Sequence, residues 1–137
     1  MKLLRVGNLG QEIPVALDKN GNYRSLSPYI KDLNPETINF TTLNKLKDIE
    51  LEGLEEINKD IRIGSCITKP GNFFAIGLNY IEHAKETGAK TPQDPVLFNK
   101  SVHSIAGPND NVLLPKGSEK LDHEIEIAFI IGKKAKR

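Results

Sequence analysis

Glycine and proline divide the second half of the chain into short pieces, and this constrains the fold more than any other feature of the sequence. The apolar runs between these residues are only a few residues long. They are Phe73–Gly77, Val96–Phe98, Asn111–Leu114 and Glu124–Ile131. Short apolar runs bounded by turn residues are typical of β-strands joined by loops. We therefore expect a β-roll, barrel or sandwich in this half of the chain.

The first half has the pattern of a small α/β domain. Lys2–Val6 and Ile13–Leu17 are expected to pair as strands, and Tyr23–Leu26 to follow as a third strand after a turn at Asn20-Gly21. Leucine and isoleucine at near-helical spacing predict an amphipathic helix over Thr42–Leu54. Ser27-Pro28 and Asn34-Pro35 are further candidate helix starts. The predicted fold class is α+β, with domains at residues 1–66 and 67–137.

Composition excludes several classes of protein. The 137 residues carry a net charge of +1, which argues against a broadly basic nucleic-acid binder. The single cysteine, Cys66, cannot form an internal disulfide or a zinc finger. The sequence contains no apolar run of the roughly 20 residues that a membrane span needs. We therefore expect a cytoplasmic protein that binds neither nucleic acid nor membrane.

The segment Leu121–Gly132 alternates with a period of two and predicts a β-strand. Glu124 and Glu126 then point to the same side, roughly 7 Å apart at the backbone. Two carboxylates so placed suit a hard cation such as Mg²⁺ or Mn²⁺. The alternative is an acidic outer face of a solvent-exposed strand. Ala128 and Ile130 continue that face as apolar residues, which a merely solvated face does not explain.

A second candidate segment runs from Gly77 to Gly88. A strand is expected to end at Gly77, and a short helix to run from there to a glycine stop at Gly88. His83 and Glu86 are three residues apart and share one helix face. A carboxylate this near can orient an imidazole and raise its pKa, as a general base requires. An ordinary surface pair is the alternative.

Lys100 follows the apolar run Pro95–Asn99. A cation at the end of a strand can meet an anionic oxygen of a substrate. The alternative is a lysine turned to solvent. His103 and Cys66 have no partners in the sequence pattern and are interpreted as structural.

Together these segments resemble the fumarylacetoacetate hydrolase superfamily, over about half of the chain. The N-terminal Met1–Arg5 also resembles the small first domain of bacterial members labelled 2,4-diketo-3-deoxy-L-rhamnonate hydrolase, ureidoglycolate lyase or 2-hydroxyhepta-2,4-diene-1,7-dioate isomerase. The motifs that carry the resemblance are Lys69-Pro70-Gly71, Gly77-Leu78-Asn79-Tyr80 with His83-Ala84 and Glu86-Thr87-Gly88, Pro95–Lys100, Gly107-Pro108-Asn109-Asp110, Leu114-Pro115 with Gly117-Ser118, and Asp122 with Glu124-Ile125-Glu126 and Gly132-Lys133.

The resemblance implies a role for each matching residue. Glu124 and Glu126 are expected to be two of three carboxylate ligands to Mg²⁺ or Mn²⁺. His83 and Glu86 are expected to activate water, and Lys100 to lie near substrate oxygens. The third ligand of the family is an aspartate some distance after the Glu-x-Glu strand, so residues 67–137 are expected to be the start of a catalytic β-roll. The chain is thus interpreted as an N-terminal fragment of a protein about twice its length.

The implied function is that of a metal-dependent hydrolase. It is expected to cleave a C–C bond of an acylpyruvate-like 2,4-diketo acid through a metal-bound enolate. Ureidoglycolate lyase, decarboxylase or diene-dioate isomerase activity on the same scaffold stays open. So do an inactive, truncated chain that serves as a binding or assembly module, and a surface Glu-x-Glu without function. The expected partners are a small anionic 2-oxo acid and, in the full-length protein, a second copy of the chain.

Overall fold

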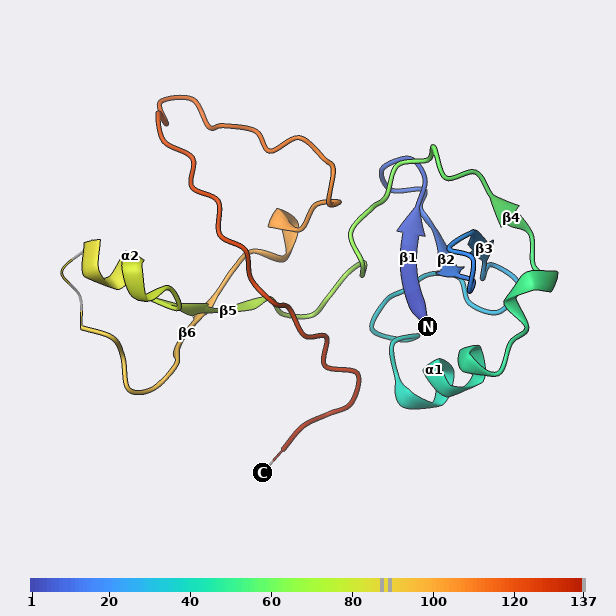
Figure 1. Ribbon diagram of the computed structural model, residues 1–137. Coiled ribbons are helices and arrows are strands. Elements are labelled where there is room, and N and C mark those ends of the chain that lie inside the picture. Colours follow the sequence, from blue (N-terminus) through green and yellow to red (C-terminus); the bar gives the residue numbers. More distant parts are fainter. Residues whose placement is uncertain (87, 89, 137) are drawn as a thin grey trace. The chain divides into compact units, whose positions relative to one another are not determined.

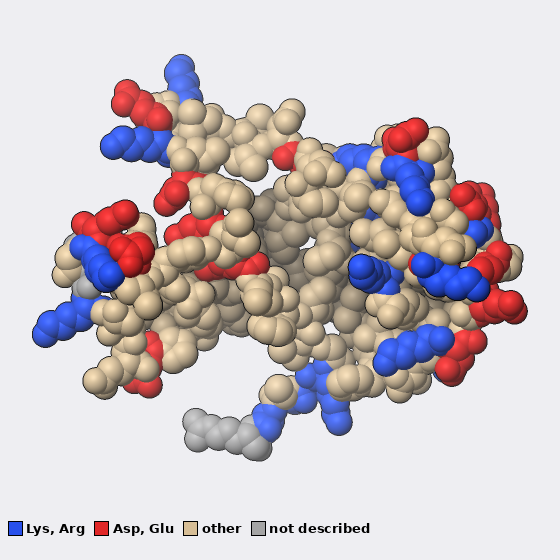
Figure 2. Space-filling model, viewed as in Figure 1, with Lys and Arg blue, Asp and Glu red and all other residues tan. Residues whose placement is uncertain are grey.

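The structure, a computed structural model, describes residues 1–86, 88 and 90–136. They form two compact units. One comprises Met1–Thr68 together with the residues from Ala106 onwards, and the other comprises Lys69–Ile105. The predicted domain division at residues 66 and 67 stays a prediction. On the face drawn in Figure 2, Lys and Arg side chains are interspersed with Asp and Glu.

A four-stranded antiparallel sheet forms the centre of the first unit (Figure 1). Its strands lie in chain order: β1 (Lys2–Val6), β2 (Ile13–Leu17), β3 (Tyr23–Ser25) and β4 (Glu56–Ile57). The predicted bounds of β1 and β2 are confirmed, and β3 ends one residue before the predicted Leu26. The three predicted strands are close in sequence, so their pairing requires only tight turns.

The turn between β2 and β3 is organised by the Asp18 carboxylate. It accepts hydrogen bonds from the backbone N–H of Asn20 at 2.9 Å and of Asn22 at 2.8 Å, and from Arg24 Nε at 2.9 Å. Gly21 adopts a φ of +77°, a conformation that glycine reaches without steric cost. Burial opposes ionisation of Asp18, but the hydrogen bonds from Asn22, Arg24 and Asn20 outweigh it and lower its pKa from 3.8 to about 2.

Asp18 is therefore expected to contribute to acid stability. Because its pKa is lower in the folded state, the stabilisation is fully present above pH 3.8 and is lost as the pH falls toward about 2. Asp18→Asn should lose less stability than the parent between pH 4 and pH 2, as measured by urea unfolding across this range. Asp94→Asn, which removes an exposed carboxylate, is the control and should keep the pH dependence of the parent. Identical acid profiles for Asp18→Asn and the parent would contradict the assignment.

The core of this unit lies between the sheet and helix α1 (Phe40–Lys47). The Asn39 side chain caps α1 by accepting from Thr42 N at 2.9 Å. The predicted helix Thr42–Leu54 was too long, because α1 ends at Lys47 and only a short 3-10 helix, Leu51–Gly53, follows. The buried apolar residues are Ala16, Leu26, Ile30, Leu33 and Leu46.

No helix begins at the two proline positions proposed as starts, Ser27-Pro28 and Asn34-Pro35, within the described residues. Each instead makes a single turn, closed by Ile30 N donating to Leu26 O at 3.1 Å and by Ile38 N donating to Asn34 O at 2.9 Å. The Asn34 side chain also accepts from the backbone of Glu36 at 2.8 Å, which favours a turn over a continuing helix.

The second unit contains a two-stranded antiparallel sheet, β5 (Phe74–Gly77) with β6 (Val96–Asn99). Helix α2 (Ile81–Glu86) follows β5, and a short 3-10 helix, Val102–Ser104, follows β6. The apolar runs that predicted these two strands are confirmed. Helices and antiparallel sheets together are consistent with the α+β class. None of the helices among the described residues is long and apolar enough to cross a membrane.

The other two predicted strands are wrong for this structure. Asn111–Leu114 and Leu121–Gly132 are irregular. A strand requires a neighbouring strand for its backbone N–H and C=O groups, and neither segment belongs to a sheet among the described residues. Residues 121–131 are all exposed, and Ile127 and Phe129 are each 84% exposed, so no apolar face of this segment is buried. A β-roll is therefore not confirmed.

Candidate functional site

The segment that carries His83 begins with an unusual backbone conformation. Leu78, directly after β5, has a φ of +53°, which is uncommon for a residue with a branched side chain. Backbone strain of this kind concentrates at functional sites. Helix α2 then runs over Ile81–Glu86. Gly88 has a φ of +67° and donates its N–H to Lys85 O at 3.1 Å, so the predicted glycine stop is confirmed.

His83 and Glu86 both lie within α2, so their spacing of three residues places them on one helix face. His83 is half-buried, whereas Glu86 is exposed. The neighbouring Ala84 is buried, with 1% of its surface exposed. On the outer side, Lys85 Nζ pairs with Glu82 Oε1 at 2.8 Å. A working pair of His83 and Glu86 stays a prediction.

Lys100 lies immediately after β6 and extends the pairing of β5 with β6 by one residue. Its backbone N–H donates to Phe73 O at 2.7 Å, and its Nζ lies 5.8 Å from the centroid of the Phe73 ring. A cation over an aromatic face is held by the quadrupole of the ring. The side chain is exposed, so an anionic oxygen can still reach the ammonium group. Its role in a pocket stays a prediction.

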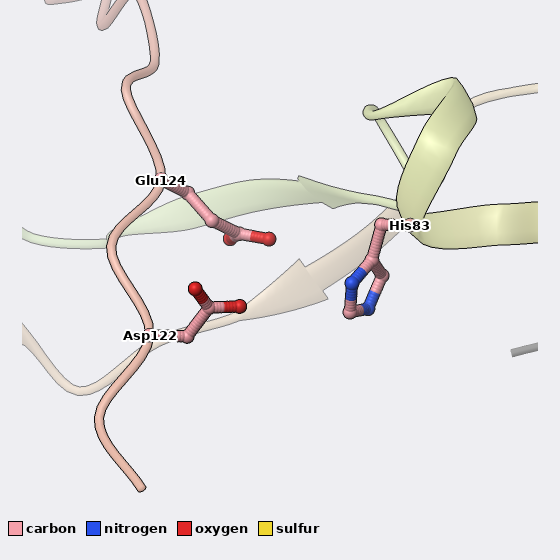
Figure 3. Close-up of side chains that lie close together, drawn as sticks. All are labelled: His83, Asp122 and Glu124. Carbon is pink, nitrogen blue, oxygen red and sulfur yellow. The ribbon is translucent and has the colours of Figure 1, made fainter. Parts of the chain in front are cut away.

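Asp122 and Glu124 extend from the same side of their segment, and their carboxylates approach each other (Figure 3). A carboxylate oxygen of each lies within 4.8 Å of the other. Oxygen ligands bind Mg²⁺ or Ca²⁺ at about 2.0–2.6 Å, so one cation can bridge oxygens that are up to about 5 Å apart. The donor set and its spacing therefore fit a divalent cation.

Asp122 was not selected as a ligand from the sequence, although in an alternating segment Asp122 and Glu124 share one face. The two-residue spacing that singled out Glu124 and Glu126 applies equally to Asp122 and Glu124, so the signal was present. Asp122 is also oriented locally, because its Oδ1 accepts from His123 N at 2.8 Å. Glu126 is exposed and stays a predicted ligand. Figure 3 also draws His83, which belongs to the other unit.

Residues 72–137 match the family model described as fumarylacetoacetate (FAA) hydrolase C-terminal. The comparison supports the fumarylacetoacetate hydrolase superfamily. The matched residues include all five predicted site residues and Asp122. The order of the motifs along the sequence had indicated the same superfamily.

Curated relatives from Burkholderia have names that begin "Putative hydrolase". One from Burkholderia ambifaria is 45% identical over 132 residues, which are 96% of this chain and 47% of the relative. One from Burkholderia cenocepacia is 45% identical over 136 residues, 99% of this chain and 48% of the relative. One from Burkholderia multivorans is 43% identical over 132 residues, 96% of this chain and 47% of the relative. The chain thus spans about half the length of these relatives.

Proposed function

We propose that this chain contributes the base and the first metal ligands to a metal-dependent hydrolase of the fumarylacetoacetate hydrolase superfamily. The proposed substrate is a small 2,4-diketo acid whose C–C bond is cleaved. The pair formed by Asp122 and Glu124 carries the proposal, because its carboxylate oxygens lie within bridging distance of one cation. The family match over residues 72–137 and the hydrolase names of the relatives support the reaction class.

Asp122 and Glu124 would hold Mg²⁺ or Mn²⁺, with Glu126 as a further carboxylate two residues on. Carboxylates are the side-chain ligands that these cations prefer, and an anionic site suits a doubly charged ion. The bound cation supplies Lewis-acid stabilisation of negative charge on substrate oxygens.

His83 acts as the general base in this proposal. Its imidazole takes a proton from the water molecule that attacks the carbonyl distal to the substrate carboxylate. Glu86 lies on the same face of α2 and can accept a hydrogen bond from the other ring nitrogen, which would orient the imidazole.

Lys100 provides the positive charge for an anionic group of the substrate. The ammonium group rests over the Phe73 ring and remains accessible to solvent. A cation held in this way attracts a carboxylate or an oxyanion without a further rearrangement of its side chain. The lyase and isomerase alternatives use the same residues, and a panel of acylpyruvates, ureidoglycolate and diene-dioates separates them by product analysis.

The proposal predicts that Glu124→Gln weakens the binding of Mn²⁺ by at least about tenfold. Loss of a group that only supports a metal ligand costs about 10–100-fold, and loss of a ligand should cost no less. Mn²⁺ titration of the chain, followed by electron paramagnetic resonance, measures the dissociation constant. Asp122→Asn is expected to show a similar loss. Glu119→Gln removes an exposed carboxylate nearby and serves as the control. An unchanged affinity in Glu124→Gln would remove Glu124 from the metal site.

A further inference from the structure

Five charged side chains form a continuous chain of ion pairs in the unit that contains β1, and sequence reasoning gave none of them this role. Acid and base alternate along it, so every member has a partner of opposite charge. Two of the links are bidentate, with two hydrogen bonds each. In order, the members are Asp32, Arg5, Glu12, Arg62 and Asp110.

The centre of this ion-pair chain is buried. The side chains of Arg5 and Glu12 are each 5% exposed. Arg5 donates to Asp32 from Nε at 2.6 Å and from Nη2 at 2.9 Å, and its Nη2 lies 3.3 Å from Glu12 Oε2. The opposite side of the Glu12 carboxylate accepts from Arg62 Nη1 at 2.9 Å. Charges this deep persist only when they are paired, which fixes the geometry of the central members.

The last link holds Asp110 to Arg62. Arg62 donates from Nε at 2.7 Å and from Nη2 at 2.6 Å, one bond to each carboxylate oxygen. The same carboxylate accepts from the backbone N–H of Gly107 at 2.7 Å. The hydrogen bond from Arg62, and then that from Gly107, lower the pKa of Asp110. A β-carbon at Gly107 would overlap the carbonyl oxygen of Ile63, so the chain approaches residue 63 as closely as glycine allows.

A second point of contact lies beyond the carboxylates. An added β-carbon at Gly132 would stand 3.1 Å from the carbonyl oxygen of Ile38, so the backbone at residue 132 also lies close to the N-terminal residues. Residues 111–131 therefore run between the ion pair of Asp110 and the close backbone approach at Gly132. Fixing both ends of a segment reduces the conformations that it can sample.

We propose that Arg62 is a positioning residue for the metal-binding carboxylates of Asp122 and Glu124. Its clamp on Asp110 fixes the point from which their segment departs. This inference rests on the proposed function, because the carboxylates are the metal ligands of that proposal. Arg62 itself touches neither the metal nor the substrate. The Gly107–Asp110 motif, which belongs to the matched family region, thus acquires a physical role as the attachment point of the ligand segment.

The test measures two quantities: the affinity for Mn²⁺ and the hydrogen-exchange protection of the Gly107 N–H, which donates to Asp110. Arg62→Gln is expected to raise the Mn²⁺ dissociation constant about tenfold, the cost typical of a group that orients a ligand. It should also speed hydrogen exchange at Gly107, while the strands β1 to β3 keep their protection. Lys19→Gln removes the same charge from the exposed ion pair with Glu52 and should change neither readout. Arg62→Lys, which keeps the charge without the bidentate geometry, should lie between the parent and Arg62→Gln.

Asp110→Asn keeps the test decisive if Arg62→Gln fails to fold, because Asn can still accept one hydrogen bond. Combining the two changes should weaken affinity no further than either one alone, since both break the same link. Unchanged affinity in Asp110→Asn, with the parent binding Mn²⁺, would overturn the positioning role and leave the proposed function intact. A parent that does not bind Mn²⁺ would overturn the metal site and the positioning role together.

Discussion

Replacing His83 by alanine is expected to lower turnover by about 10²- to 10⁴-fold, the contribution typical of a general base. The reason is that the attacking water then has to lose its proton to solvent. The assay uses a chimaera in which this chain replaces the matching 132 residues of the Burkholderia ambifaria relative. Acylpyruvate consumption is followed at saturating Mg²⁺. Adding free imidazole should restore part of the activity, because it can enter the space left by the ring.

Two controls separate the chemistry of His83 from its other effects. Lys85→Ala removes an exposed neighbour on α2 and should keep turnover close to that of the parent. Mn²⁺ affinity should also stay unchanged in His83→Ala, because the proposal assigns the metal to the carboxylates. If the variant lost Mn²⁺ along with turnover, His83 would be a metal ligand, and the assigned base would be wrong.

The strands that could be predicted from sequence are those specified by neighbouring residues. β1 and β2 alternate, lie close together in sequence and pair through a short turn, so local pattern and tertiary pairing agree. β5 and β6 were also predicted, each with one bound displaced by one residue, although 18 residues separate Gly77 from Val96, because turn residues bound both apolar runs.

The segment Leu121–Gly132 shows why a clear pattern can still fail. Its alternation indicates which side chains would share a face if the segment were a strand. A strand forms, however, only when another strand supplies hydrogen bonds to its backbone. The predicted ligand pair depended on that strand. The structure brings the oxygens of Asp122 and Glu124 within 4.8 Å of each other, so Asp122 joins the candidate ligands, which the spacing rule had limited to Glu124 and Glu126.

The ion-pair chain could not have been predicted from sequence. Arg62 and Asp110 are 48 residues apart, and each is one of many charged residues without a distinctive local pattern. Charged side chains are exposed by default, so nothing in the sequence marks Arg5 and Glu12 as buried. Only the tertiary fold brings them together.

Leu26→Ala is expected to lower the free energy of unfolding by about 2–5 kcal/mol, the range for a fully buried leucine. Leu26 is 0% exposed and packs with Ala16 and Leu33 in the core of the first unit. Because small domains are stable by only about 5–15 kcal/mol, this is a large part of the total. Urea unfolding measures the change. Leu9→Ala, at a leucine that is 80% exposed, is the matched control and should change stability by less than about 0.5 kcal/mol.

The same variant distinguishes positioning from stability. Leu26 is an apolar core residue and not a member of the ion-pair chain, so Leu26→Ala should destabilise the unit while the folded molecules keep the parent's Mn²⁺ affinity. Arg62→Gln should instead weaken Mn²⁺ binding more than Leu26→Ala does for each kcal/mol of unfolding free energy that the variant loses. Equal losses of affinity in the two variants at equal stability would mean that Arg62 acts only by stabilising the fold. A loss confined to Arg62→Gln would assign the geometry of the carboxylates to the clamp.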